Sequence, residues 1–504
     1  MTVFECAEVE VPLCYDGVCT SDDAIDVFVK RRRAKTTASK AVLLLEGGPG
    51  YATTGMEYRI ERLTKLLGDS VDYYLIDHRG TGRSEFLQCE AAQALTSGSP
   101  KGKDLSVDEL QACFADLNFK YDGQAAAFGT TSVAMDVRTM VELFMTKQEV
   151  FVTGYSYGTY VTQRIMQLDI PQVKGYVFDG VDALSVKGDP VETANSHWNQ
   201  AMVAPSRRLL EFCFDDPKCP VKFKSRDTVV EETLAFMDKL DEQAATNPCA
   251  MILVHGLNYS EPSVGLRGWM NKRVLDVTSR ATALTMLGRV MRCNSQDIQK
   301  MKEIFLAKND IPPLPTPAVL DELTDESPLL YNLVVYSERW AQPAPTLRQR
   351  NDFYLDSVFS MEDSDAALQY CVFTGSTESA CQELEKNLPT TRKQTFFYKR
   401  DKYVSKPMTL PAHASALILN GGLDFQTPRE FGELLYSKLK GSGTGVMMVN
   451  FDYGVHCRGE SVAEAPDRPC YDSIIAGFIQ HSGDVAKIDT TCMADLPDTA
   501  FHEL

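Results

Sequence analysis

The sequence predicts an α/β fold: a mostly parallel central sheet with helices on both faces, interrupted by a large helical insertion. Short, nearly continuous apolar runs alternate with helix-length segments near both ends of the 504-residue chain. Strands have this appearance when helices cover both faces of a parallel sheet. Between about residues 185 and 400 helical periodicity, charge and proline-containing loops replace the alternation. The apolar runs are 41–45, 71–76, 149–152, 175–178, 416–419 and 446–451.

The remaining elements follow in chain order. Alternating apolar and polar positions at 9–13 and 25–30 predict an antiparallel hairpin at the start. Apolar residues at helical spacing over 132–144 predict a helix between two of the buried strands. A chain of 504 residues exceeds what one compact core usually holds. We therefore expect a first part of the α/β core at 1–184, a helical cap insertion at 185–400, and a second part of the core at 401–504.

Composition and charge restrict the class of partner. With 44% hydrophobic and 24% charged residues, the chain has the composition of a soluble globular protein. Its formal net charge of -18 would repel a polyphosphate, so we expect no nucleic-acid partner. No run of about 18 apolar residues occurs, so we expect no membrane span. The first residues lack the basic and apolar regions of a signal peptide, which fits either a cytosolic chain or a mature form.

The 14 cysteines bear on the compartment. None stands in a Cys-x-x-Cys motif or at zinc-finger spacing, so we expect no metal site. Free thiols in a cytosolic enzyme are one interpretation, but close pairs in loop-like segments favour disulfides in a secreted, lysosome-like or vacuole-like location. The sequon at Asn258 is compatible with secretion and marks a candidate glycosylation site. The expected pairs are Cys14/Cys19, Cys89/Cys113, Cys213/Cys219, Cys371/Cys381 and Cys470/Cys492.

A serine between two glycines is the strongest candidate for a reacting group. The apolar run at 150–153 leads into Gly154-Tyr155-Ser156-Tyr157-Gly158 and then into a helix-forming stretch. A tight strand-to-helix turn of this kind lifts a serine hydroxyl above the carboxyl end of a sheet. The alternative is a plain strand–turn–helix junction without chemistry. The context favours Ser156 as a nucleophile.

A nucleophilic serine needs a base and an acid that orients the base. Asp424 follows the run at 416–419, and His456 follows the run at 446–451, so both are expected on the same rim of the sheet as Ser156. Asp424 could instead cap the helix that starts after Pro428, and His456 could be a loop histidine without a role. The other six histidines fit the expected position after the last strand less well.

Backbone N–H groups near the serine would complete such a site. The run at 41–45 ends in Glu46-Gly47-Gly48-Pro49-Gly50, and glycines let backbone amides approach a ligand oxygen. The expected oxyanion donors are the N–H groups of Gly48 and of Tyr157, the residue after the nucleophile. A second glycine-rich turn at 77–84 is expected to shape the rim.

Four motifs in this order resemble the prolyl and tripeptidyl aminopeptidases, a family of serine peptidases with the α/β-hydrolase fold. The likeness covers roughly 35–185 and 405–495, and the last hundred residues, with Cys470 and Cys492, resemble the C-terminal segment of the tripeptidyl (TAP-like) branch. The resemblance implies secreted exopeptidases that cut next to a free N-terminus under a helical cap. The motifs are Gly-Gly-Pro-Gly at 47–50, Asp-His-Arg-Gly-Thr-Gly-Arg-Ser at 77–84, Gly-Tyr-Ser-Tyr-Gly-Thr-Tyr at 154–160 and Gly-Gly-Leu-Asp-Phe-Gln-Thr-Pro at 421–428.

Two positions depart from the family pattern. Glu46 stands where relatives more often carry histidine or asparagine. A carboxylate beside an oxyanion hole is unfavourable unless it pairs with a cation, so Glu46 is a candidate for holding a substrate ammonium; a local hydrogen bond is the alternative. Cys457 directly follows the expected base, which affects the local geometry and access.

The expected function is that of a serine exopeptidase, of proline iminopeptidase or tripeptidyl aminopeptidase type, acting on a peptide or small acyl substrate through an acyl-enzyme. Such chemistry requires no metal or organic cofactor. An esterase or amidase of the same fold is the first alternative, and a non-catalytic binding protein on a hydrolase scaffold is the second.

Overall fold

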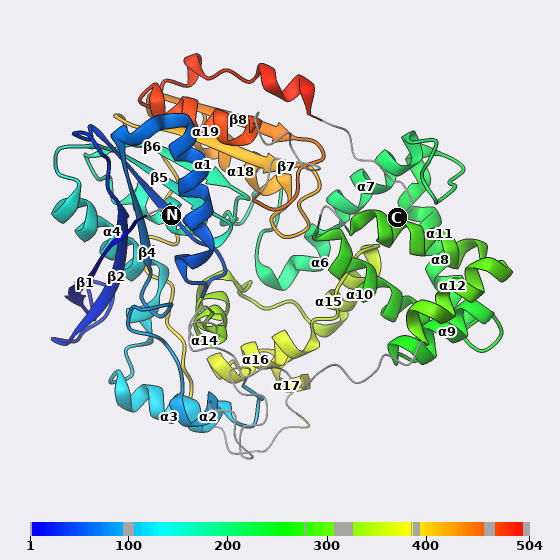
Figure 1. The fold of residues 1–504 in the computed structure, drawn as a ribbon. Helices are drawn as coiled ribbons and strands as arrows, with labels where there is room; N and C mark the ends of the chain where they lie inside the picture. Colours follow the sequence, from blue (N-terminus) through cyan, green and yellow to red (C-terminus); the bar gives the residue numbers. More distant parts are fainter. Residues whose placement is uncertain are drawn as a thin grey trace.

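A computed structural model describes residues 3–93, 105–276, 279–306, 326–384, 386, 394–457 and 469–496. Within these residues one eight-stranded sheet has the order β1-β2-β4-β3-β5-β6-β7-β8 (Figure 1). The strands are β1 (Glu5–Pro12), β2 (Ala24–Arg32), β3 (Lys40–Leu45), β4 (Val71–Asp77), β5 (Glu149–Tyr155), β6 (Val173–Asp179), β7 (Ser415–Gly421) and β8 (Gly445–Phe451).

The strand directions identify the fold class. β2 runs antiparallel to both β1 and β4, whereas every neighbouring pair from β4 to β8 is parallel. An open sheet with this order and one antiparallel second strand is the α/β-hydrolase arrangement, so the predicted fold class is confirmed. The predicted opening hairpin is β1–β2. The segment between β6 and β7 leaves the sheet and returns to the adjacent position, because those two strands pair directly.

Helices bury both faces of the sheet. Alternate residues of β3 point to opposite faces, so Val42 and Leu44 join one apolar cluster while Leu43 and Leu45 join another. On the first face lie α1 (Glu57–Leu67) and α19 (Cys470–Gln480), which also contact each other. On the second face lie α4 (Thr130–Phe144), α5 (Tyr157–Gln167) and α18 (Arg429–Leu439).

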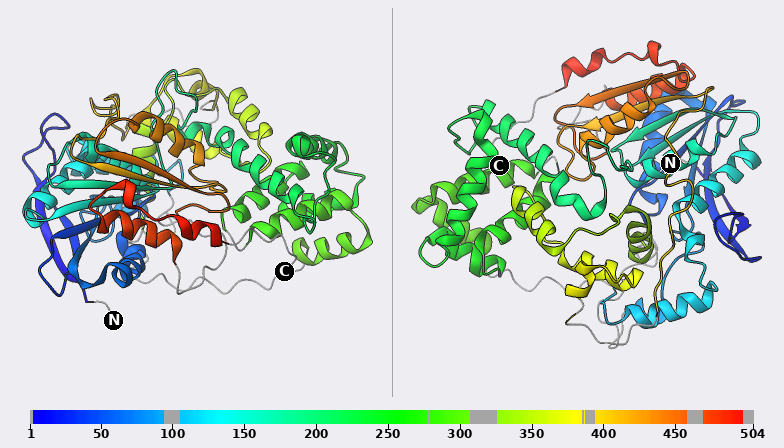
Figure 2. Two further views of the ribbon diagram at one scale, coloured as in Figure 1. Left: turned by 90° about the horizontal axis from the view of Figure 1, so that it is seen from above. Right: turned by 180° about the vertical axis from the view of Figure 1, so that it is seen from behind.

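The long segment between β6 and β7 falls into two parts. The helices of the first part lie beside the sheet (Figure 2), and their buried side chains, Leu209, Leu253 and Leu287 among them, form a separate apolar core. Its helices are α6 (Trp198–Ala201), α7 (Val203–Asp215), α8 (Val229–Glu242), α9 (Pro248–Leu257), α10 (Pro262–Val274), α11 (Arg280–Arg292) and α12 (Ser295–Phe305). α15 (Leu347–Asp356) follows later in the chain and lies against α6.

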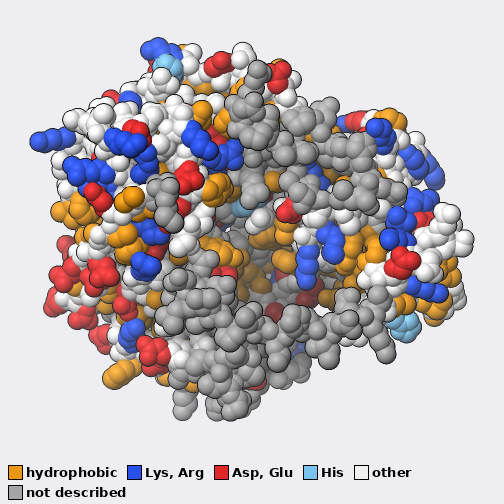
Figure 3. All heavy atoms as spheres, viewed as in Figure 1, with side chains coloured by type: hydrophobic (Ala, Val, Ile, Leu, Met, Phe, Trp, Pro, Cys, Tyr) orange, Lys and Arg blue, Asp and Glu red, His pale blue; other side chains and the backbone are white. Residues whose placement is uncertain are grey.

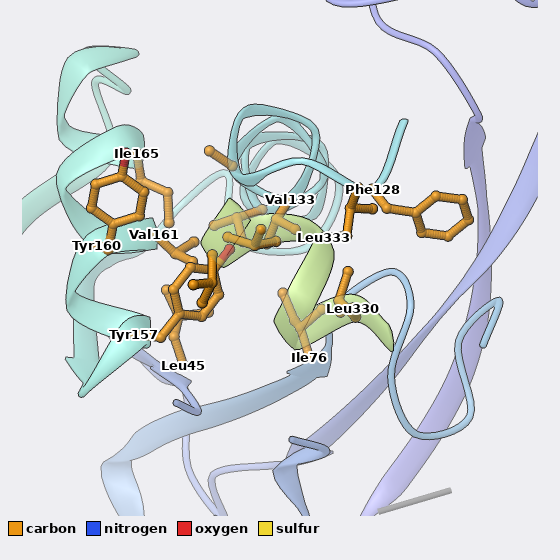
Figure 4. Close-up of a cluster of buried hydrophobic side chains, with 14 of the residues drawn as sticks. Leu45, Ile76, Phe128, Val133, Tyr157, Tyr160, Val161, Ile165, Leu330 and Leu333 are labelled. Carbon is orange, nitrogen blue, oxygen red and sulfur yellow. The ribbon is translucent and has the colours of Figure 1, made fainter. Parts of the chain in front are cut away.

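The second part packs into the core of the sheet instead. Leu330 and Leu333 of α14 (Pro328–Val334) lie among Leu45, Ile76 and the α5 side chains (Figure 4). The π-helical turn η6 (Val335–Arg339), α16 (Ser364–Thr374) and α17 (Ser379–Leu384) contribute to the same cluster. The boundaries at 184/185 and 400/401 stay a prediction.

The insertion also holds the loop after β7. Leu423 and Phe425 are both buried in the core of the first part of the insertion, although they belong to the C-terminal part of the chain. The Phe425 ring lies 5.6 Å from that of Phe359, edge to face. Asp424, between them, is fully buried.

All 14 cysteines lie in the described residues, and 12 of them form six disulfides. The five expected pairs are confirmed. A sixth, Cys249–Cys293, joins α9 to the end of α11 and was not predicted. Cys6 and Cys457 are free. Six disulfides are compatible with an oxidising compartment.

Candidate active site

Ser156 occupies a tight turn between β5, which ends at Tyr155, and α5, which begins at Tyr157. Its φ of 53° and ψ of -126° form a backbone conformation that non-glycine residues rarely adopt. Side chains cannot replace the flanking glycines, because a Cβ on Gly154 would collide with the Gly158 carbonyl and one on Gly158 with the Leu45 carbonyl. The turn is therefore built by close backbone packing, as the sequence predicted.

Asp424 and His456 are brought together at the same rim. Oδ2 of Asp424 lies 2.9 Å from Nδ1 of His456. The other carboxylate oxygen, Oδ1, accepts the backbone N–H groups of Gln426 and Thr427 at 2.7 and 2.8 Å. The alternative role for Asp424 fails on geometry, because α18 begins at Arg429 with Pro428 as its N-cap and has no side-chain cap. The carboxylate instead fixes its own loop and the imidazole.

Thr427 supports this pair and was not identified from the sequence. Its hydroxyl donates to Asp424 Oδ2 at 2.9 Å and lies 3.1 Å from His456 Nδ1. The available signal was a threonine three residues after the aspartate, at the distance of an Asx-type loop. With three donors and the imidazole around it, Asp424 is held in one orientation.

Electrostatics favour the charged form of His456. Burial alone would lower the pKa of the imidazole, but the charge and hydrogen bond of Asp424, together with Cys457, raise it well above its ordinary value. A buried carboxylate paired with an imidazole stabilises the imidazolium in this way. The pair is thus suited to receiving a proton.

Ser156 and His456 line one cavity of about 370 Å³. On the face shown in Figure 3, the surface is hollowed near the middle of the molecule. Asp182 in the cavity wall is ion-paired with the buried Arg339. Glu46 and Glu326 add two further carboxylates to the wall. The volume falls in the range of small-molecule sites.

The glycine loop after β3 lies directly against the serine. A Cβ placed on Gly47 would lie 2.8 Å from Ser156 Cβ and 3.3 Å from Ser156 Oγ. Gly48 lines the cavity with a φ of 109°, which favours glycine. Tyr157 is the first residue of α5, so its N–H is one of the amides that have no partner within the helix. Gly47 was not singled out from the sequence, although it belongs to the same glycine run.

Glu46 and Asn258 have different surroundings. Oε1 of Glu46 accepts the N–H of Gly47 at 2.9 Å, so the local hydrogen bond is present, and Glu46 also lines the cavity. Asn258 is exposed at the C-terminal end of α9 and does not line the cavity. Its glycosylation stays a prediction.

The second glycine-rich turn is held by buried polar contacts. Asp77 Oδ1 accepts the N–H of Thr53 at 2.9 Å and its hydroxyl at 2.6 Å. Arg79 is fully buried and pairs with Asp136 at 2.6 Å. None of these four side chains lines the cavity, which agrees with a structural role.

The described residues contain neither a metal site nor a membrane-spanning helix. Among them, no cluster of three or more histidine, cysteine or acidic side chains has the arrangement of a metal site. In the same part of the chain, no helix combines the length and the apolar character needed to cross a membrane.

Comparisons with known proteins give distant similarities. No family model matches the chain. YuaR of Escherichia coli (strain K12), whose name describes it as a hydrolase, is 24% identical over 252 residues, which is 48% of this chain and 48% of YuaR. The chain thus matches about half the length of this relative.

Solved structures similar to this chain include a proline iminopeptidase from Mycobacterium smegmatis, with 11% identity, a TM-score of 0.36, and coverage of 95% of this chain and 100% of that one. VinJ is 12% identical, with a TM-score of 0.37 and coverage of 94% of this chain and 98% of VinJ. The esterase EaEST from Exiguobacterium antarcticum is 12% identical, with a TM-score of 0.32 and coverage of 91% of this chain and 97% of EaEST.

Proposed function

We propose that this protein is a serine hydrolase that acts through an acyl-enzyme, and more narrowly an aminopeptidase. One observation carries the proposal. Ser156, on its strained turn, shares a cavity with His456, whose Nδ1 lies 2.9 Å from the buried Asp424. A nucleophile, an orienting acid and a base in this order along the chain are the parts that acyl transfer needs.

Ser156 Oγ attacks the carbonyl carbon of the substrate while His456 Nε2 takes the hydroxyl proton. Asp424 holds the Nδ1–H and stabilises the imidazolium. The oxyanion that forms is bound by the expected donors, the N–H groups of Gly48 and Tyr157. When the tetrahedral intermediate collapses, the C–N bond breaks and His456 returns the proton to the leaving amine. A water molecule then attacks the acyl-enzyme by the same sequence and releases the acid and the free serine.

The charges in the cavity support a substrate with a free amino group. The cavity wall carries three carboxylates, those of Glu46, Asp182 and Glu326, and Asp182 is ion-paired with Arg339. A protonated N-terminus is the complementary ligand, and the family resemblance points to the same substrate class.

The disulfides and the exposed Asn258 support action outside the reducing cytosol. We propose that the protein works in a secreted or vacuole-like location and carries a glycan at Asn258. Protein from a secretory eukaryotic host should lose mass on treatment with an N-glycosidase. An unchanged mass, or the same loss in Asn258→Gln, would contradict the glycan.

The first experiment tests the nucleophile with a fluorophosphonate probe on the wild type and on Ser156→Ala. We expect covalent labelling of the wild type only, located at Ser156 by peptide mass spectrometry. Equal labelling of both proteins would refute the assignment of Ser156.

The second experiment tests the substrate class with matched free and N-acetylated peptide amides and with an acyl ester. An aminopeptidase cleaves the free peptide and leaves the acetylated one. Glu326→Gln should raise KM for the free peptide, while Glu303→Gln, an exposed carboxylate on α12, serves as the matched control. Equal cleavage of both peptides would exclude the exopeptidase, and cleavage of the ester alone would favour the esterase.

A further inference from the structure

A buried arginine connects the neighbours of the proposed nucleophile and base. Arg59 lies in α1, and its side chain is 7% exposed. Its guanidinium carbon sits 3.9 Å from the centre of the Tyr155 ring, and its Nη2 donates to the Cys457 carbonyl at 2.9 Å. Tyr155 directly precedes Ser156, and Cys457 directly follows His456. One side chain thus contacts both halves of the site.

The contact with Cys457 occurs at a strained point of the backbone. Cys457 has a φ of 53°, a conformation that L-residues rarely adopt. Such a conformation persists only where its surroundings hold it, and the Arg59 hydrogen bond fixes the carbonyl of this residue. Its thiol also donates to the Asp179 carbonyl at 3.4 Å. These two hydrogen bonds therefore set the orientation of the chain immediately after His456.

Asp179 also links the segment of Ser156 to the segment of His456. Its carbonyl, which the thiol contacts, also accepts the Ser156 N–H at 3.0 Å. Its carboxylate accepts the hydroxyl of Tyr471, a residue of α19. Burial raises the pKa of this carboxyl to about 6, against the opposing charge of Arg59. Near pH 7 the buried cation is balanced by a carboxylate in the same cluster.

Burying a charged group in this position is unfavourable unless its contacts compensate for the lost hydration. Removing a guanidinium from water is unfavourable, and a carbonyl, an aromatic face and a nearby carboxylate offset this cost only in good geometry. An apolar side chain could fill the space beneath the turn but could not hold the Cys457 carbonyl. The guanidinium of Arg59 is therefore explained by the backbone carbonyl that it holds.

We propose that Arg59 is a positioning residue that sets the place of His456 relative to Ser156, an inference that rests on the proposed function. Arg59 also lines the cavity, but in this role it does not contact the reacting atoms. It acts through the residue before the nucleophile and the residue after the base.

The test compares Arg59→Met, Arg59→Lys and a matched control, Arg267→Met. Arg267 is also buried, donates to one backbone carbonyl, that of Ser357, and lies over one tyrosine ring, that of Tyr354, but it belongs to the insertion and does not line the cavity. Both methionine variants therefore lose a buried guanidinium, and only one loses a link to the site.

Displacing reacting groups by about 1 Å costs on the order of 100-fold in rate. We expect Arg59→Met to lower kcat and the fluorophosphonate labelling rate by about 10- to 100-fold, with KM changed by less than about threefold. Arg59→Lys keeps a donor and should recover part of the loss. Arg267→Met should keep wild-type kcat and labelling rate per folded molecule, whatever it costs in thermal stability.

A second measurement separates this proposal from the proposed function. The proton between Asp424 and His456 is followed by its downfield nuclear magnetic resonance signal, which needs no substrate. We expect the signal in the wild type and Arg267→Met, and its shift or loss in Arg59→Met. A wild type that keeps this signal but fails to label refutes the proposed function alone. An Arg59→Met protein with the wild-type signal and, where the wild type labels, the wild-type rate overturns the role of Arg59.

Discussion

A single methyl group at Gly47 should disable Ser156 without unfolding the protein. In Gly47→Ala the new Cβ would lie 2.8 Å from Ser156 Cβ, 3.2 Å from the Tyr155 carbonyl oxygen and 3.3 Å from Ser156 Oγ. Carbon atoms pack at about 3.5–4.0 Å, so the loop or the serine must move by roughly 1 Å. The φ of Gly47 lies outside the left-handed region, so alanine meets no backbone penalty there. The whole effect should come from displacement, at a cost of about 100-fold in kcat/KM.

The assay measures kcat/KM, fluorophosphonate labelling and thermal unfolding of Gly47→Ala beside Gly268→Ala. Gly268 lies within α10, and a Cβ there would have no atom within 4 Å. The control should gain up to about 1 kcal/mol of helix stability and keep its rates. Gly47→Ala should stay folded and lose activity. Wild-type rates in Gly47→Ala would refute the argument that the glycine loop presses on the nucleophile.

Three further predictions concern pH, a disulfide and a buried charge. Only neutral imidazole accepts a proton, so kcat/KM should rise as the pH passes the pKa of His456, which lies above the ordinary value of about 6.5. A pH–rate profile with its midpoint at or below that value would contradict this prediction. Replacing Cys249 and Cys293 with alanine opens a link across 44 residues and should cost about 2–4 kcal/mol in urea unfolding, whereas equal stability would speak against the bridge. Glu338→Gln removes the carboxylate 3.1 Å from the buried Arg164 and leaves that guanidinium with Asp401, at 3.5 Å, so it should cost up to about 3–5 kcal/mol in thermal unfolding; a change below about 1 kcal/mol would mean that the pair contributes little.

The sheet could be predicted from the sequence because parallel strands buried on both faces leave apolar runs that no other element produces so regularly. The same logic located Ser156, Asp424 and His456, since each follows such a run and the carboxyl ends of parallel strands share one rim. The contacts that support them could not be predicted in this way. Arg59 and the carbonyl it holds are 398 residues apart, and nothing local marks that arginine.

The insertion shows the limit of periodicity in another form. Helical spacing indicates that one face of a segment is buried, but not against which partner. The residues 185–400 therefore had the pattern of one helical cap, although α14 and α16 pack into the core of the sheet while α7 to α11 form a separate core. The bridge Cys249–Cys293 was missed for the same reason, since its cysteines become neighbours only when α9 and α11 pack.

The burial of Leu423 and Phe425 in the separate helical core has a consequence for protein engineering. An exchange of the insertion for that of a relative would remove the packing partners of both side chains and leave two apolar groups exposed on either side of Asp424. The donated helices would have to fit the loop that holds Asp424 against His456. Chimeras should therefore transfer 423–425 together with the insertion, and selectivity is better altered by point substitutions in the cavity wall than by exchange of the whole cap.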